Sequence, residues 1–133
     1  TWIHTLDREK IILKLNAAFK EINKKINGLI QVNVSSEESK SGCDPKEMLG
    51  LASIIESSSH INLRGIMALP DINAELTERN LQMNRVNQLS QQLKSKFPNA
   101  KEISLGTTND FEDAIAHGSS MVRIGSSIFG ERV

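Results

Sequence analysis

The feature of this sequence that most restricts its fold is a regular alternation of short runs rich in β-branched residues with longer segments of helical periodicity. The strand-like runs cover residues 1–6, 28–34, 61–69, 102–106 and 121–125. A helix-like segment separates each run from the next. Because successive parallel strands are joined by right-handed crossovers through a helix, this order predicts an α/β fold with one parallel sheet covered by helices.

The first two helix-like segments show start signals. Asp7 can cap the first helix. Its apolar side chains recur at steps of three and four, at Ile11, Leu15, Phe19, Ile22 and Ile26. Asp44, Pro45 and Glu47 supply an N-cap, a first-turn proline and a capping-box acid for the second helix. The apolar face expected there consists of Met48, Leu51, Ala52 and Ile55.

The later helix-like segments also have clear limits. A long helix is expected before Pro98, with apolar residues at Leu76, Met83, Val86, Leu89, Leu93 and Phe97. Asn109 and Glu112 form a second capping box, for a short helix that ends at Gly118. Two architectures contain this alternation, a doubly wound open sheet and an arc of a (β/α)₈ barrel. In both, ligands bind at the carboxyl ends of the strands.

Composition narrows the function classes. The 133 residues are the size of a single domain, and 16 Lys and Arg residues balance 16 Asp and Glu residues. Without net charge or a basic stripe, a nucleic-acid partner is not expected, and the apolar runs are too short to span a membrane. The three histidines lack metal-ligand spacing, and His4 is expected inside the core or barrel. The single cysteine, Cys43, cannot form an internal disulfide and is expected to be inert. It favours a reducing compartment, and the cytoplasm is expected, with the mitochondrion as the alternative.

One arginine stands inside the last strand-like run, MVRIGSSIFG (121–130). Alternate side chains of a strand face opposite ways, so Arg123 would point away from the helices and would need an acceptor. The Gly125-Ser126-Ser127 stretch behind it suits an anion, because backbone N–H groups can approach closely and hydroxyls can donate. The pattern suggests a ligand that carries a phosphate and a hydrogen-bond acceptor.

A similar stretch, Gly106-Thr107-Thr108-Asn109, follows the preceding strand. Both stretches would then meet at one end of the sheet and form one phosphate site. Each alone is also compatible with an ordinary turn or helix cap, and Arg123 with a structural ion pair. The co-occurrence of the two favours the phosphate site.

Four segments resemble the pyridoxal phosphate homeostasis proteins along essentially the whole chain. They are WIHTLD (2–7), IQVNVSSEESKSG (30–42), LRGIMALP (63–70) and ISLGTTNDFEDAIAHGSSMVRIGSSIFGER (103–132). The resemblance implies the alanine racemase N-terminal fold, a (β/α)₈ TIM-type barrel, here as a single domain over residues 1–133 with about five parallel strands. It also implies binding of pyridoxal 5′-phosphate (PLP) and a carrier or regulatory role in vitamin B6 homeostasis, without an established catalytic activity.

The resemblance assigns cofactor-binding roles residue by residue. Arg123 would lie beside the pyridine nitrogen and keep it unprotonated, which makes the ring a poor electron sink. Thr108, Gly125 and Ser126 would hold the phosphate, and the remaining cofactor-binding residues would be Ser104 and Ile124. The family commonly has Met-Ser-Asp-Asp at 107–110 and Thr-Ala at 126–127, but the hydroxyls at both phosphate positions are kept here.

The strand that carries the Schiff-base lysine in that family has no counterpart here, so the chain corresponds to the C-terminal part of a barrel. Non-covalent PLP binding is therefore expected, with Lys40 as an alternative acceptor of the aldehyde. Exposed sheet edges would favour self-association. Two other interpretations stay open: a fragment of a PLP-dependent racemase-like or decarboxylase-like enzyme, and a half-barrel that binds no cofactor.

Overall fold

The computed structural model describes residues 2–35, 42–69 and 75–105. In these residues four strands alternate with three α-helices. The strands are β1 (Trp2–Leu6), β2 (Ile26–Gln31), β3 (Ile61–Ala68) and β4 (Glu102–Leu105). The helices are α1 (Glu9–Glu21), α2 (Met48–Glu56) and α3 (Leu76–Lys96), and a 3₁₀ turn, η1 (Pro45–Glu47), leads into α2. The predicted strand at 121–125 and short helix at 109–118 lie outside the described residues.

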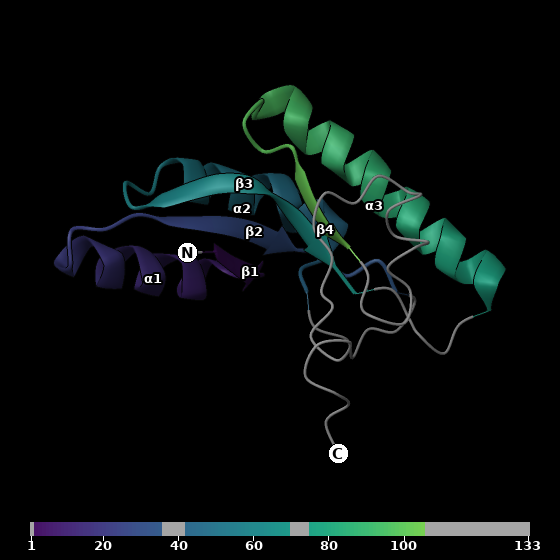
Figure 1. The fold of residues 1–133 in the computed structure, drawn as a ribbon, viewed down its shortest axis with the longest axis horizontal. Coiled ribbons are helices and arrows are strands. Elements are labelled where there is room, and N and C mark those ends of the chain that lie inside the picture. The colour runs from purple at the N-terminus through teal and green to yellow at the C-terminus, as the bar shows by residue number, and fades with distance from the viewer. Residues whose placement is uncertain (1, 36–41, 70–74, 106–133) are drawn as a thin grey trace, which may run out of the picture.

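The order of the strands decides between the two architectures. All pairings are parallel, and the strands lie side by side in chain order, β1-β2-β3-β4 (Figure 1). A doubly wound sheet reverses its order at a switch point, whereas a barrel adds each strand beside the previous one. The described sheet is therefore an arc of the barrel type, which confirms the predicted TIM-barrel class.

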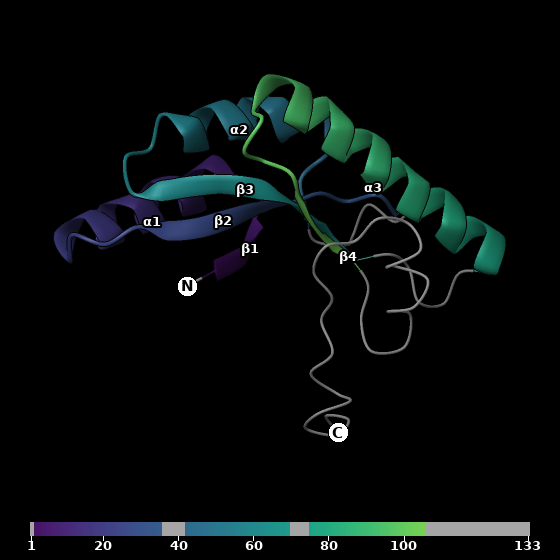
Figure 2. The ribbon, with the colours of Figure 1, turned by 45° about the horizontal axis from the view of Figure 1, so that its top comes forward.

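The helices contribute to one core against one face of the sheet. Figure 2 shows α2 and α3 on the same side of the strands. Buried side chains from every described strand and helix form a single cluster, which includes Ile12, Ile30, Met48, Ile66, Leu89 and Ile103. The four residues expected to form the apolar face of α2 are all buried. In α3 the expected face is confirmed from Met83 to Leu93, but Leu76 is 54% exposed.

The start of α2 follows its sequence signals. The Asp44 carboxylate accepts a hydrogen bond from the Lys46 backbone N–H at 2.9 Å, and Pro45 occupies the first turn. The first turn is 3₁₀, and the α-helix proper begins at Met48. Asp44 is therefore confirmed as a cap, for the 3₁₀ turn that leads into α2.

The predicted cap of α1 is wrong. Arg8 is the N-cap residue, with extended backbone and no capping hydrogen bond from its side chain. Asp7 lies one position too early to reach the first helical N–H groups, and its carboxylate is instead 3.8 Å from Arg8 Nε. The single fully buried residue of α1 is Ile12, while Ile11 and Leu15 pack at the edge of the core.

The predicted end of α1 is also wrong. The helix ends at Glu21, because Asn23 turns the chain with a left-handed φ of 53°. Ile22 is consequently 58% exposed, and Ile26 is the first residue of β2 instead of the last of the helical face. β2 accordingly runs from 26 to 31, earlier than the expected 28–34.

The register between β2 and β3 shifts by one residue. Gly28 pairs with Leu63, whereas Leu29 pairs with Gly65, so Arg64 is the extra residue of a bulge. Gly65 has a φ of +151° and lies against the backbone of Glu102 in β4.

Among the described residues, no helix is both long and apolar enough to cross a membrane.

Candidate functional site

Three side chains lie side by side at the carboxyl ends of β2, β3 and β4. Gln31 of β2 pairs in register with Met67 of β3, and Met67 pairs with Ser104 of β4. Their neighbours Ile30, Ile66 and Ile103 belong to the core under the helices. Because side chains alternate along a strand, Gln31, Met67 and Ser104 face the opposite way, toward what is the interior of a barrel. We call these three residues the strand-end row.

The strand-end row is closed to water and chemically mixed. Gln31, Met67 and Ser104 are 3%, 4% and 0% exposed, and Leu29, two residues before Gln31, is also buried. The row thus combines an amide, a thioether and a hydroxyl beside an apolar side chain. A methionine sulfur packs favourably against aromatic rings, while the amide and the hydroxyl can bind polar substituents. This combination suits a flat ring that carries polar groups.

A hydrogen bond links β1 to the strand-end row. His4 Nδ1 lies 3.0 Å from Ser104 Oγ, although the two residues are 100 positions apart in the chain. β1 and β4 are the outer strands of the described sheet, so the contact spans its interior face. This confirms that His4 is an interior residue. Toward the other end of β1, the Arg64 guanidinium carbon lies 5.8 Å from the centre of the Trp2 ring.

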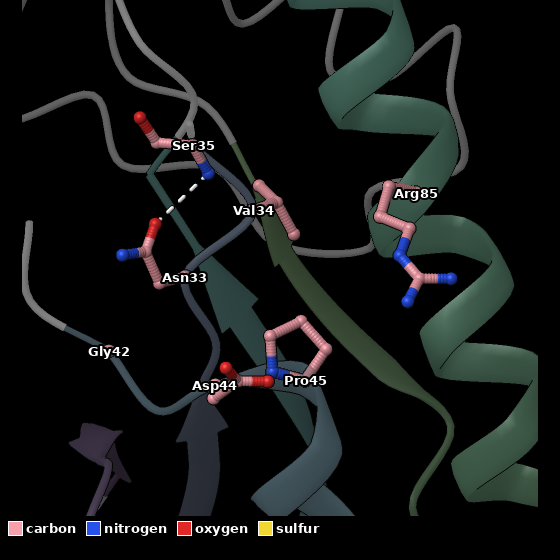
Figure 3. A pocket seen from close by; sticks show the side chains of 7 residues that line it. All are labelled: Asn33, Val34, Ser35, Gly42, Asp44, Pro45 and Arg85. Atoms are coloured by element: carbon pink, nitrogen blue, oxygen red, sulfur yellow. Dashed lines mark hydrogen bonds between the residues drawn. The ribbon is translucent and has the colours of Figure 1, made fainter. Parts of the chain in front are cut away.

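A separate pocket of about 470 Å³ lies on the helix side of the same strand ends (Figure 3). The segments before and after the 36–41 gap line one side of it, and Arg85 of α3 faces them. Asn33 Oδ1 accepts a hydrogen bond from the Ser35 N–H at 3.0 Å, which fixes the turn after β2. The pocket residues are Asn33, Val34, Ser35, Gly42, Asp44, Pro45 and Arg85.

Cys43 has a structural position beside that pocket. Its backbone N–H donates to Gln31 O, and its carbonyl accepts from the Asn33 N–H, so it ties the loop to the end of β2. Burial, with a smaller contribution from the Glu47 carboxylate, raises the pKa of the thiol to about 12. The thiol is thus protonated near neutral pH, as expected for an inert cysteine. No group of His, Cys, Asp and Glu within the described parts of the chain could hold a metal ion.

Of the residues predicted to bind the cofactor, the structure describes Ser104. It lies at the carboxyl end of its strand and faces the interior. The other predicted positions, Thr108, Arg123, Ile124, Gly125, Ser126 and the alternative lysine Lys40, lie outside the described residues and stay predictions. Sequence reasoning did not identify Gln31 or Met67 as site residues. Each occupies an interior position of a recognised strand, but the register that aligns them is set by the bulge at Arg64.

Comparison with known proteins gives a consistent result. The family model described as "Alanine racemase, N-terminal domain" matches residues 1–133. A relative from Pasteurella multocida, named pyridoxal phosphate homeostasis protein, is 44% identical over 133 residues. That match covers 98% of this chain and 57% of the relative, so the chain spans a little over half the length of this curated relative.

Solved structures share the fold. An unknown protein from Bifidobacterium adolescentis superimposes with a TM-score of 0.89 at 30% identity, and the match covers 96% of this chain and 52% of that one. PipY of Synechococcus elongatus, solved with PLP bound, has a TM-score of 0.84 at 21% identity. The match covers 97% of this chain and 60% of the PipY chain. At that identity the likeness to PipY concerns the fold alone.

Proposed function

Because this chain belongs to the alanine racemase N-terminal domain family, we propose that it binds PLP on the interior face of its sheet and serves in PLP homeostasis as a carrier or regulator. The observation that carries the proposal is the strand-end row. It places an amide, a thioether and a hydroxyl together, out of contact with water, where barrels of this type bind their ligands. The name of the Pasteurella multocida relative supports the physiological role.

The described residues fit the chemistry of PLP. The cofactor is an aromatic ring with a phosphate, a phenolate and an aldehyde, all of which accept hydrogen bonds. Met67 and Leu29 offer apolar and polarizable surface for a ring. Gln31 and Ser104 offer donors for oxygen atoms. When bound, PLP supplies an electrophilic aldehyde and a ring that can take up negative charge.

The residues of this chain would bind and orient the cofactor without supplying a proton for chemistry. Thr108, Gly125 and Ser126 would donate to the phosphate, and Arg123 would donate to the ring nitrogen. A guanidinium in that place holds the nitrogen unprotonated, because two positive charges side by side repel each other. A ring in that state stabilises a carbanion poorly, which suits storage and delivery better than amino-acid chemistry.

Titration of the purified protein with PLP, followed by the absorbance of the cofactor, tests the proposal. We expect a saturable shift of the absorbance band. Replacing Arg123 with Ala should weaken binding by at least about tenfold, because a hydrogen bond to a charged group contributes about 1.5–3 kcal/mol. The matched control is Arg85→Ala, which removes an exposed arginine from α3, on the helix side of the sheet. That variant should bind within about twofold of wild type.

The same experiment separates the alternatives. A protein that gives no spectral change with PLP is a barrel segment without a cofactor, and the proposal is then wrong. Consumption of alanine or another amino acid by the PLP-loaded protein, followed by chiral chromatography, would instead identify a racemase-like or decarboxylase-like enzyme. Equal affinity of the Arg123→Ala and Arg85→Ala variants would remove Arg123 from the site.

A further inference from the structure

The hydrogen bond between His4 and Ser104 lies at the point where the cofactor is proposed to bind. Ser104 is fully buried, and its Oγ is 3.0 Å from His4 Nδ1. Because the hydroxyl is sealed from bulk water, protein groups decide where its single hydrogen points. His4 therefore controls what Ser104 can offer to a ligand.

The direction of this hydrogen bond determines the role of Ser104. A serine hydroxyl has one donor and two acceptor sites, and a neutral imidazole has one N–H and one lone pair. If His4 Nδ1 accepts, the hydroxyl hydrogen is used and Ser104 shows a ligand only lone pairs. If His4 Nδ1–H donates to Oγ, the hydroxyl hydrogen stays free. The oxygen atoms of PLP are acceptors, so only the second arrangement gives a favourable contact.

We propose that His4 is a positioning residue of the cofactor site: its Nδ1–H donates to Ser104 Oγ and frees the Ser104 hydroxyl to donate to an oxygen atom of PLP. The proposal rests on the proposed function and extends it to a residue on the far strand of the described sheet. It also gives β1 a role in ligand selection, because a histidine in the other tautomer would favour a ligand that donates.

The charges on the interior face are compatible with this role. Glu102 lies two residues before Ser104 on β4, and so on the same face by strand alternation. On β3 the Arg64 guanidinium lies over Trp2, which precedes His4 by two positions on β1. Asn27, Leu29 and Gln31, the interior positions of β2, are uncharged. The described interior positions thus include one acid, on β4, and one base, on β3, while β2, the strand that pairs with β1, places no charge on this face.

A double-mutant cycle on PLP affinity tests the coupling between the two residues. His4→Leu removes the donor, and we expect affinity to fall by about three- to tenfold, the value of one hydrogen bond. In a Ser104→Ala background the same change should have no effect, because His4 acts through Ser104. His4→Asn keeps an amide N–H near the Nδ1 position and should restore affinity to within about twofold of wild type. Equal losses from His4→Leu in both backgrounds, or wild-type affinity in Ser104→Ala, would overturn the proposal.

A second measurement does not depend on PLP. The ¹⁵N chemical shifts of the His4 ring report which nitrogen carries the hydrogen. We expect Nδ1–H in the wild-type protein and loss of that preference in Ser104→Ala. A ring protonated only on Nε2 contradicts the proposal even if PLP binds. Failure to bind PLP, with Nδ1–H observed, would refute the proposed function while supporting the orientation of Ser104 by His4.

Discussion

Gly65 shows how a single residue shapes the interior face of the sheet. It follows Arg64, the extra residue of the β2–β3 bulge, and its φ of +151° is one that other residues rarely adopt. A Cβ atom at this position would overlap the carbonyl oxygen of Glu102 on β4. The glycine therefore allows β3 and β4 to approach closely, and this approach sets Met67 beside Ser104.

We predict that Gly65→Ala lowers the free energy of unfolding by about 3 kcal/mol or more, through backbone strain and displacement of β4. Gly50→Ala is the matched control. Gly50 lies in α2 with open space around it, so the alanine should stabilise the protein by about 0.5–1 kcal/mol. Urea denaturation of the two variants measures both effects. Similar stabilities of the two variants would show that β4 accommodates a side chain at position 65.

At the scale of elements, α2 depends on its first turn for both position and stability. Asp44 caps the 3₁₀ turn that leads into the helix, and the turn is also part of the wall of the helix-side pocket. Asp44→Ala should destabilise the protein by about 1 kcal/mol, because the Lys46 N–H loses its acceptor. Asp44→Asn keeps an acceptor and should recover most of this loss. Thermal unfolding compares the two, and equal melting temperatures would mean that the cap contributes nothing.

The sequence predicts elements well where local signals agree and poorly where the backbone geometry decides. The Asp44-Pro45 signal and the apolar face of α2 are confirmed, because capping and burial there depend on nearby residues. The end of α1 could not be predicted. Its apolar spacing continues formally to Ile26, but the left-handed turn at Asn23 interrupts the helix.

The candidate site was predictable only in part, for a related reason. Ser104 was identified through family resemblance, and the structure places it at a strand end on the interior face. Gln31 and Met67 escaped sequence reasoning, because a one-residue bulge fixes which side chains align across three strands. The choice of a barrel arc over a doubly wound sheet likewise depends on strand order, which is a property of tertiary structure.

At the scale of the whole molecule, the described strands differ in how they are supported. β2 is paired on both sides, by β1 and β3, and β3 by β2 and β4. Within the described residues β1 has one neighbouring strand, and its pairing with β2 is irregular between Ile3 and Leu6. A strand with one partner leaves alternate N–H groups exposed and opens at lower free-energy cost.

Hydrogen exchange followed by mass spectrometry should therefore rank the strands by the exchange rates of their backbone amides. We expect amides of Ile26–Gln31 and Ile61–Ala68 to exchange slowest and those of Trp2–Leu6 to exchange at least about tenfold faster, after correction with the unfolded protein as reference.

Repeating the measurement over a range of protein concentrations tests the predicted self-association through sheet edges. If a second copy pairs with β1, protection of Trp2–Leu6 will rise with concentration while that of β2 stays constant. Protection of β1 equal to β2 at every concentration would contradict an open edge, because β1 would then have a second permanent partner.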